Sequence, residues 1–191
     1  MSKKSPIKSA IDKLPDGVKK NIALGEEVIT FLKSFVIAER TNYIILTNLR
    51  LIYFDEKFLG RYTFKSLPFQ KLLQVKAHKG AVVWGEVSFK MEDGALHVLE
   101  RVNRNDLANF IDALEIAYNS IAVEPVSMKR EAGLLGIADW EFNKPEELVF
   151  RQQPSTQQLV EDPLNQLKMR FIKGEISEEE YKTKLRVLQE K

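Results

Sequence analysis

The sequence predicts a mainly β fold with α-helices, in which about seven short antiparallel strands form a bent barrel, one helix caps it, and a two-helix hairpin follows. Three observations lead to this prediction. Apolar and polar residues alternate with a period of two from residue 28 to residue 101, where β-branched and aromatic types dominate. An amphipathic stripe of helical period follows, up to Ile121. Residues 162–191 then carry the start and stop signals of two short helices.

The composition is that of an ordinary globular chain. Its 191 residues include 29 basic and 27 acidic side chains, for a formal net charge of +2, which gives no reason to expect a nucleic-acid partner. Cysteine is absent, and this excludes disulfides, a thiolate nucleophile and a cysteine-ligated zinc ion. No apolar run is longer than four residues, so we expect a cytoplasmic protein, with the inner face of the membrane as an alternative location.

Seven candidate strands fill the region of period two. Asn48 and Asp93-Gly94 provide turn signals between neighbouring strands. His78 and His97 fall in the polar phase of their strands, so both are expected at the surface. Trp84 is expected in the core, with a place in an interface as the alternative. The expected strands cover residues 28–37, 43–46, 51–54, 62–64, 72–78, 87–91 and 96–98.

A helix is expected directly after the strands, with Asn103 or Asn105 as its N-cap. Its apolar residues recur every three or four positions and form a full stripe, which we expect to close the open end of the bent sheet. The stripe consists of Leu107, Phe110, Ile111, Leu114, Ala117, Tyr118 and Ile121.

Residues 1–24 form a basic lead with the apolar spacing of a short helix. Six lysines stand against two aspartates in the first 20 residues. A solvated basic end is the simpler interpretation, and contact with an anionic lipid surface is the alternative. The lysines concerned are Lys3, Lys4, Lys8, Lys13, Lys19 and Lys20.

Residues 123–160 combine Pro and Gly punctuation with apolar stretches. The polar tract RQQPSTQQ is typical of a flexible linker, so the sequence predicts a docking segment followed by a linker. Its apolar side chains are expected to pack on the sheet domain or on a sister subunit rather than in a membrane. They are Leu134, Leu135, Trp140, Phe142, Leu148 and Phe150.

The first helix of the segment 161–191 has clear end signals. Asp162 is the expected N-cap, and Pro163 suits the first helical position because proline has no backbone N–H to leave unpaired. Gly174 is placed to end the helix in the left-handed conformation.

The second helix has an equally clear start. Ser177 and Glu180 have the spacing of a capping box, in which each side chain accepts a hydrogen bond from the backbone N–H of the other residue. Ile176 and Tyr181 occupy the two positions of a hydrophobic staple.

These two helices carry too few apolar side chains to form a stable domain alone. They therefore need another surface: their own sheet domain, a second copy of the hairpin, or a different protein. We expect the contact to be made by Leu164, Leu167, Phe171, Ile172, Tyr181, Leu185 and Leu188, with Trp140 and Phe142 as an additional docking strip.

Two resemblances to known families rest on these features. The segment 161–191 resembles the short C-terminal module known as SHOCT, through Asp162-Pro163, the Gly174-Glu175-Ile176-Ser177 turn and the acidic cap of the second helix. This resemblance implies oligomerisation or docking rather than catalysis.

Residues 25–122 resemble the bacterial pleckstrin-homology-like (PH-like) family, through Gly25-Glu26-Glu27 and the segments LTNLRLIYFD and SLPFQKLLQV. The resemblance implies a seven-stranded barrel capped by one helix, and members that self-assemble. The first strand-to-strand loop, IAERTNY, lacks the several convergent Lys and Arg donors of a phosphoinositide site.

No pattern in the sequence indicates catalysis. Serine-hydrolase, dinucleotide and P-loop motifs are absent, so we expect no catalytic, metal or cofactor-binding residue. Arg50 is expected to pair with Asp55 or with a backbone carbonyl rather than to bind an anion. The sequence therefore favours a non-catalytic adaptor or assembly protein that contacts protein, most simply a second copy of itself. The alternative is a peripheral membrane module that binds anionic lipid through its Lys-rich lead.

Overall fold

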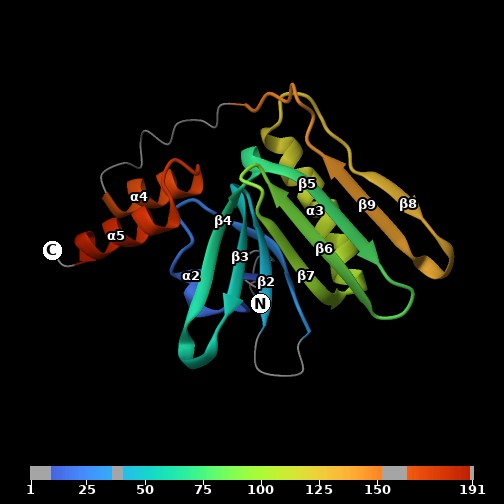
Figure 1. The fold of residues 1–191 in the computed structure, drawn as a ribbon, viewed down its shortest axis with the longest axis horizontal. Coiled ribbons are helices and arrows are strands. Elements are labelled where there is room, and N and C mark those ends of the chain that lie inside the picture. Colours follow the sequence, from blue (N-terminus) through green and yellow to red (C-terminus); the bar gives the residue numbers. More distant parts are fainter. Residues whose placement is uncertain (1–9, 36–40, 152–162, 190–191) are drawn as a thin grey trace, which may run out of the picture.

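The structure is a computed structural model, and it describes residues 10–35, 41–151 and 163–189. Two antiparallel sheets face each other with a long helix against them, and residues 10–24 and the two C-terminal helices lie against the first sheet (Figure 1). The mainly β class with C-terminal helices, predicted from sequence, is confirmed.

The first sheet has the order β1-β2-β3-β4, so each strand pairs with the next one along the chain. Short connections produce this meander, because neighbouring antiparallel strands need only a tight turn between them. The strands are β1 (Val28–Lys33), β2 (Asn42–Thr47), β3 (Arg50–Glu56) and β4 (Tyr62–Pro68).

The second sheet has the order β7-β6-β5-β9-β8. A 3₁₀ turn, η2 (Phe69–Lys71), makes the corner between β4 and β5, and at another corner the N–H of Phe35 donates to the carbonyl of Arg101 (2.9 Å). The strands are β5 (Leu72–Lys79), β6 (Trp84–Met91), β7 (Leu96–Asn103), β8 (Lys129–Ala132) and β9 (Ala138–Asn143).

The helix α3 (Arg104–Ile121) fills the space between the sheets. Its N-cap is Asn103, whose side chain accepts hydrogen bonds from the N–H groups of Asn105 and Asp106. All seven residues of the predicted apolar stripe are buried, so this prediction is confirmed.

Besides the helical residues 10–12 and the 3₁₀ turns η1 (Phe58–Gly60) and η3 (Leu134–Gly136), three short α-helices complete the described part of the chain. They are α2 (Asp16–Lys19) in the lead, and α4 (Pro163–Ile172) and α5 (Glu178–Gln189) in the C-terminal hairpin. None of the helices in the ranges described is long and apolar enough to cross a bilayer.

The strand count differs from the prediction. All seven expected strands are present, but they form two sheets rather than a continuous barrel, and β8 and β9 extend the second sheet. β9 pairs along β5, and the N–H of Arg151 donates to the carbonyl of Ile121 (2.7 Å). The sheet domain therefore continues to residue 151, beyond the expected boundary at 122, and the expected linker over residues 152–160 lies outside the described residues.

The facing of β7 is the reverse of the prediction. His97 is 6% exposed, whereas Leu96 and Val98 are 62% and 39% exposed. A bulge in the β6–β7 pairing, with Arg101 at a φ of 52°, brings Val102 back to the inner face three residues after Leu99. The prediction took the apolar Leu96 and Val98 as the inward residues, and this assigned the wrong face to His97.

Candidate functional site

The outer face of the first sheet is apolar, and the run YIIL at residues 43–46 explains why. Because side chains alternate across a strand, an unbroken apolar run is apolar on both faces. Ile44 and Leu46 face the core between the sheets, whereas Ile45 belongs to a second cluster on the other face and is also fully buried. This second face is covered by residues 10–24 of the lead and by the C-terminal hairpin.

The C-terminal hairpin packs on this face beside β4 (Figure 1). The ring of Phe171 stacks on Tyr181 at 4.6 Å with a 15° interplanar angle, and it lies 6.4 Å from the ring of Phe64. Lys71 Nζ donates to the carbonyl of Gly174 (2.9 Å) and fixes the turn between the two helices. The shared buried cluster includes Leu167, Phe171, Ile176 and Tyr181 from the hairpin, and Ile45, Ile52, Phe54 and Phe64 from the sheet.

The end signals of the hairpin are confirmed where the structure describes them. The N–H of Ser177 donates to Glu180 Oε2 (2.8 Å), and the N–H of Glu180 donates to Ser177 Oγ (3.2 Å). The hydrogen bond from the Ser177 backbone lowers the pKa of Glu180. Gly174 has a φ of 70° and ends α4, while the predicted N-cap Asp162 lies outside the described residues.

Beneath the hairpin lies an ion pair between Glu26 and Arg50, whose side chains are 0% and 1% exposed. Arg50 Nε donates to Glu26 Oε1 (2.8 Å) and Nη2 donates to Oε2 (2.9 Å), the paired geometry in which guanidinium and carboxylate bind best. The hydroxyl of Thr47 and the N–H of Ala23 also donate hydrogen bonds to the carboxylate of Glu26 (both 2.9 Å).

The same ion pair joins three parts of the chain. Arg50 Nη2 also donates to the carbonyl of Asn21 in the lead (3.0 Å). The guanidinium carbon lies 5.4 Å from the ring centre of Phe64 and 6.0 Å from that of Phe171, within the range of cation–π attraction. We call Glu26, Arg50, Phe64 and Phe171 the junction, because lead, sheet and hairpin meet there.

Of the two partners predicted for Arg50, a backbone carbonyl is confirmed by the hydrogen bond to Asn21, whereas Asp55 is wrong. Arg50 and Asp55 lie five residues apart on one strand, so their side chains point to opposite faces. The true partner, Glu26, stands in the Gly25-Glu26-Glu27 segment, which was noted only for its resemblance to a family. A buried pair 24 residues apart leaves no local periodic signal.

The structure divides the seven expected contact residues of the hairpin into two groups. Leu167, Phe171, Ile172 and Tyr181 are buried within this chain. Leu164, Leu185 and Leu188 are half-buried. The surface that the hairpin requires is thus supplied by its own sheet domain, and contact with a partner stays a prediction.

Trp140 and Phe142 do not form an exposed docking strip. Both are 3% exposed, because β9 turns these alternate residues towards α3. The ring of Phe142 lies 4.9 Å from Tyr118, and the guanidinium of Arg130 lies 5.2 Å from the ring of Trp140. They are core residues of the sheet domain.

The Lys-rich lead has its apolar side turned inward. Leu14 and Val18 are buried against the first sheet, while Lys13, Lys19 and Lys20 are exposed. This arrangement leaves only charge for a lipid surface. Lys3, Lys4 and Lys8 lie outside the described residues.

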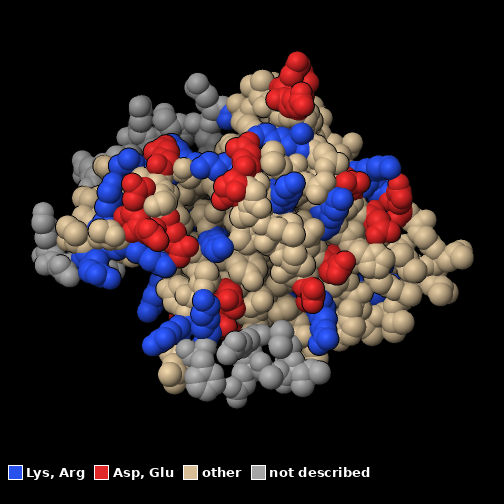
Figure 2. Space-filling model, viewed as in Figure 1, with Lys and Arg blue, Asp and Glu red and all other residues tan. Residues whose placement is uncertain are grey.

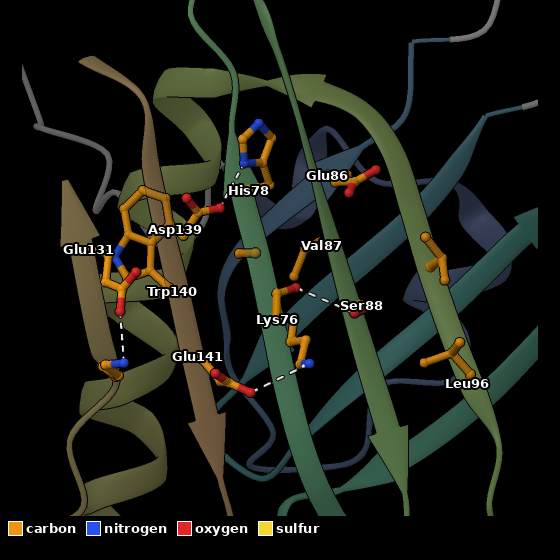
Figure 3. A pocket seen from close by; sticks show the side chains of 13 residues that line it. Lys76, His78, Glu86, Val87, Ser88, Leu96, Glu131, Asp139, Trp140 and Glu141 are labelled. Carbon is orange, nitrogen blue, oxygen red and sulfur yellow. Dashed lines mark hydrogen bonds and ion pairs between the residues drawn. The ribbon is translucent and has the colours of Figure 1, made fainter. Parts of the chain in front are cut away.

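A hollow of about 550 Å³ lies over the outer face of the second sheet (Figure 3). Its floor carries two cross-strand contacts, a hydrogen bond between His78 Nδ1 and Asp139 Oδ1 (2.7 Å) and an ion pair between Lys76 Nζ and Glu141 Oε1 (3.5 Å). All four side chains are about half exposed, so water screens both contacts. Figure 2 shows charges of both signs mixed over this face. Surface exposure of His78 agrees with the prediction, and the described residues hold no cluster of three or more potential metal ligands.

A second hollow, of about 450 Å³, lies where the hairpin turn meets β4 and β7. His97 lines it, with Lys65 and Lys71 from the sheet domain and Glu175 and Glu178 from the hairpin. Burial lowers the pKa of His97 from its ordinary value of 6.5, and the charge of Lys65 lowers it further, while Asp93 opposes the shift.

This shift predicts a loss of stability in mild acid. The unfolded chain takes up the proton of His97 more readily than the folded chain, so its contribution is full above a pH of about 6.5 and is lost as the pH falls below that value. We expect the drop in thermal midpoint between about pH 7.5 and about pH 5, which lie on either side of the ordinary histidine pKa, to be smaller in His97→Gln than in the unchanged protein. Equal drops in the two proteins would show that His97 contributes nothing.

Two protein-family models match the chain, one over the sheet domain and one over the C-terminal hairpin. The family model for the bacterial PH domain matches residues 22–116, and that for the short C-terminal domain matches residues 162–188. The chain belongs to the bacterial PH domain family and carries a short C-terminal domain.

The chain also resembles a whole relative. An uncharacterised protein of Archaeoglobus fulgidus is 35% identical over 182 residues, which cover 92% of this chain and 95% of the relative. The resemblance therefore extends over most of the chain. No solved structure matches the chain.

Proposed function

We propose that the protein is a non-catalytic assembly module, in which the docked hairpin presents a contact surface to a second copy of the chain. The supporting observation is that the hairpin has two apolar sides. Its inner side is held by the junction and the first sheet. Its outer side carries an apolar groove of about 320 Å³ between α4 and α5, lined in part by Leu167, Val187 and Leu188.

The groove is suited to a symmetric contact. Val187 is 55% exposed and Leu188 is half-buried, so both side chains gain from further burial. Two identical grooves related by a twofold axis would each contribute the same residues, which is the commonest arrangement of homodimers. A helix face that is partly buried within its own chain and buried further by a partner is a recurrent form of protein contact.

The test is the mass in solution of a variant altered only on the outer side. We expect Val187→Asp to be monomeric by light scattering and the unchanged protein to be larger, because a carboxylate cannot enter an apolar contact unpaired. Leu188 is left unchanged because it also packs against the cluster that holds the hairpin on the sheet. Glu179→Gln/Lys182→Gln, changed at exposed polar positions of the same helix, is the matched control and should keep the larger mass.

An unchanged mass in the groove variant would refute the proposal, as would a monomeric unchanged protein at high concentration. Deletion of the hairpin is a poorer test, because it would uncover Ile45, Ile52 and Phe64 on the first sheet.

The alternative, contact of the Lys-rich lead with anionic lipid, is supported by the exposure of Lys13, Lys19 and Lys20. Because the apolar side of the lead is occupied, such binding would rest on charge alone and would disappear at high salt.

A further inference from the structure

Exposed apolar side chains gather at two neighbouring turns of the second sheet. The β8–β9 turn carries Leu134 and Leu135, which are 86% and 82% exposed, and the β5–β6 turn carries Val82, which is 81% exposed. Both turns project from the lower right of Figure 1. The segments AGLLGIA (residues 132–138) and GAVVWG (residues 80–85) contain no charged residue. The corresponding end of the molecule is free of charge on the face shown in Figure 2.

Arg104 holds the two turns together at the start of α3. Its guanidinium donates to the carbonyl of Ala81 in one turn and to that of Gly136 in the other (2.7 Å). Its backbone N–H donates to the carbonyl of Val83 (3.0 Å). Gly136 has a φ of 72°, a left-handed conformation that favours glycine, and a Cβ atom there would displace the end of the Arg104 side chain. The two turns therefore form one fixed surface.

Two aromatic residues stand at the base of this surface. Phe35 and Trp84 stack with ring centres 5.0 Å apart, and they remain 55% and 41% exposed. Exposed Trp at the border between an apolar tip and a polar body is the placement found at membrane–water interfaces. The core position expected for Trp84 was wrong, because the strand begins at this residue and only its inward neighbours reach α3.

The conformation of the β8–β9 turn is unusual for its sequence. Leu135 has a φ of 57° and Gly136 a φ of 72°, and the N–H of Ile137 donates to the carbonyl of Leu134 (3.1 Å). This is a type I′ turn, whose first central position favours Asn, Asp or Gly, because a larger side chain is crowded at positive φ. Leucine is therefore a poor choice for the fold.

The β3–β4 turn repeats the same arrangement. Leu59 has a φ of 61° and is 83% exposed, and Gly60 follows with a φ of 71°. Two hairpins thus place an exposed leucine at a turn position where a small polar residue would be more stable and better solvated. Backbone strain that is kept at an exposed position suggests a role in binding rather than in stability.

We propose that the β5–β6 and β8–β9 turns insert into the surface of a lipid bilayer. Val82, Leu134 and Leu135 enter the apolar layer, and Trp84 lies at the level of the head groups. Turns without charged residues can enter this layer at little cost. The inference uses no residue of the Lys-rich lead or of the C-terminal hairpin, so it does not depend on the function proposed for either.

A protein partner fits this surface less well than lipid. The strongly exposed apolar side chains of the two turns are three, Val82, Leu134 and Leu135, whereas each partner in a standard interface buries roughly 800 Å² from some 20–30 residues. They also stand on projecting turns, whereas a protein contact usually offers a complementary groove or flat patch.

Flotation of the full chain with vesicles tests the proposal. We expect binding to phosphatidylcholine vesicles, with or without phosphatidylglycerol, and a loss of at least about tenfold in Leu134→Ser/Leu135→Asn, since two apolar side chains no longer enter the lipid. Asn suits the left-handed position, so this variant should fold at least as stably as the unchanged protein. Ile116→Ser, at a 73% exposed position on α3, is the matched control and should bind normally.

Brominated lipid provides a second readout. Trp84 fluorescence should be quenched in bound protein, whereas Trp140, at 3% exposure, should not respond, so Trp84→Phe should abolish the quenching. The proposal is overturned by any of three results: no binding to either vesicle, equal loss in Ile116→Ser, or a turn variant that changes the mass in solution but not the vesicle binding. Binding that needs phosphatidylglycerol and ignores the turn variant would also overturn it, in favour of the lysines.

Discussion

Replacement of Arg50 by alanine is expected to destabilise the protein by about 3–5 kcal/mol, because it leaves the carboxylate of Glu26 buried without its countercharge. Glu26→Ala should lower the free energy of unfolding by a similar amount, since it leaves the guanidinium of Arg50 buried without its countercharge. Native domains are stable by only about 5–15 kcal/mol, so either change removes a large part of the total. The effect should be large because both side chains are almost completely buried.

Urea unfolding of both single variants and of the double variant measures this coupling. The double variant should lose less than the sum of the singles, by about 1–3 kcal/mol, because no charge is left alone. Lys76→Ala and Glu141→Ala provide the matched pair: their charges are 3.5 Å apart but exposed, so the coupling should stay below about 1 kcal/mol. If the Glu26–Arg50 coupling were equally small, the junction would not depend on this pair.

Local signals in the sequence predicted local structure well. The capping box of Ser177 and Glu180, the left-handed Gly174 and the stripe of α3 all depend on residues a few positions apart, and all are present. The family resemblance also depends on contiguous segments and was confirmed. Such features can be read from sequence because the atoms that interact are neighbours in the chain.

The β8–β9 extension was missed because its strands are short and interrupted. Trp140 and Phe142 do alternate with polar residues, but Gly133 and Gly136 on one side and Pro145 on the other resemble linker punctuation. What makes β9 a strand is its pairing along β5, some 65 residues earlier. A partner at that distance overrides local propensity.

The candidate site shows the same division between local and distant information. The sequence showed that the hairpin needs a surface, but it left open whether that surface belongs to this chain. The answer depends on Ile45 and Ile52, whose outward facing appears only once the register of β2 and β3 is known. The unbroken apolar run at residues 43–46 was the available signal, because a strand with one solvated face would alternate.

Replacement of Phe171 by alanine is expected to release the hairpin from the first sheet. Phe171 touches both Tyr181 within the hairpin and Phe64 across the contact, and truncation of a buried Phe typically costs about 3–5 kcal/mol. The hairpin has little stability of its own, so this loss should appear as local opening rather than global unfolding.

Hydrogen exchange distinguishes local opening from global unfolding, because it reports protection separately for each helix and strand. We expect amide protection over α4 and α5 to fall by about 100-fold or more in Phe171→Ala, as 3 kcal/mol implies at about 1.4 kcal/mol per factor of ten, while α3 keeps its protection because its stripe lies in the other cluster. Val187→Ala, at a 55% exposed position of the same hairpin, is the control and should change protection little. If α4 and α5 kept normal protection in Phe171→Ala, the hairpin would be held by other contacts, and the junction would lose its role as the point where lead, sheet and hairpin are fastened together.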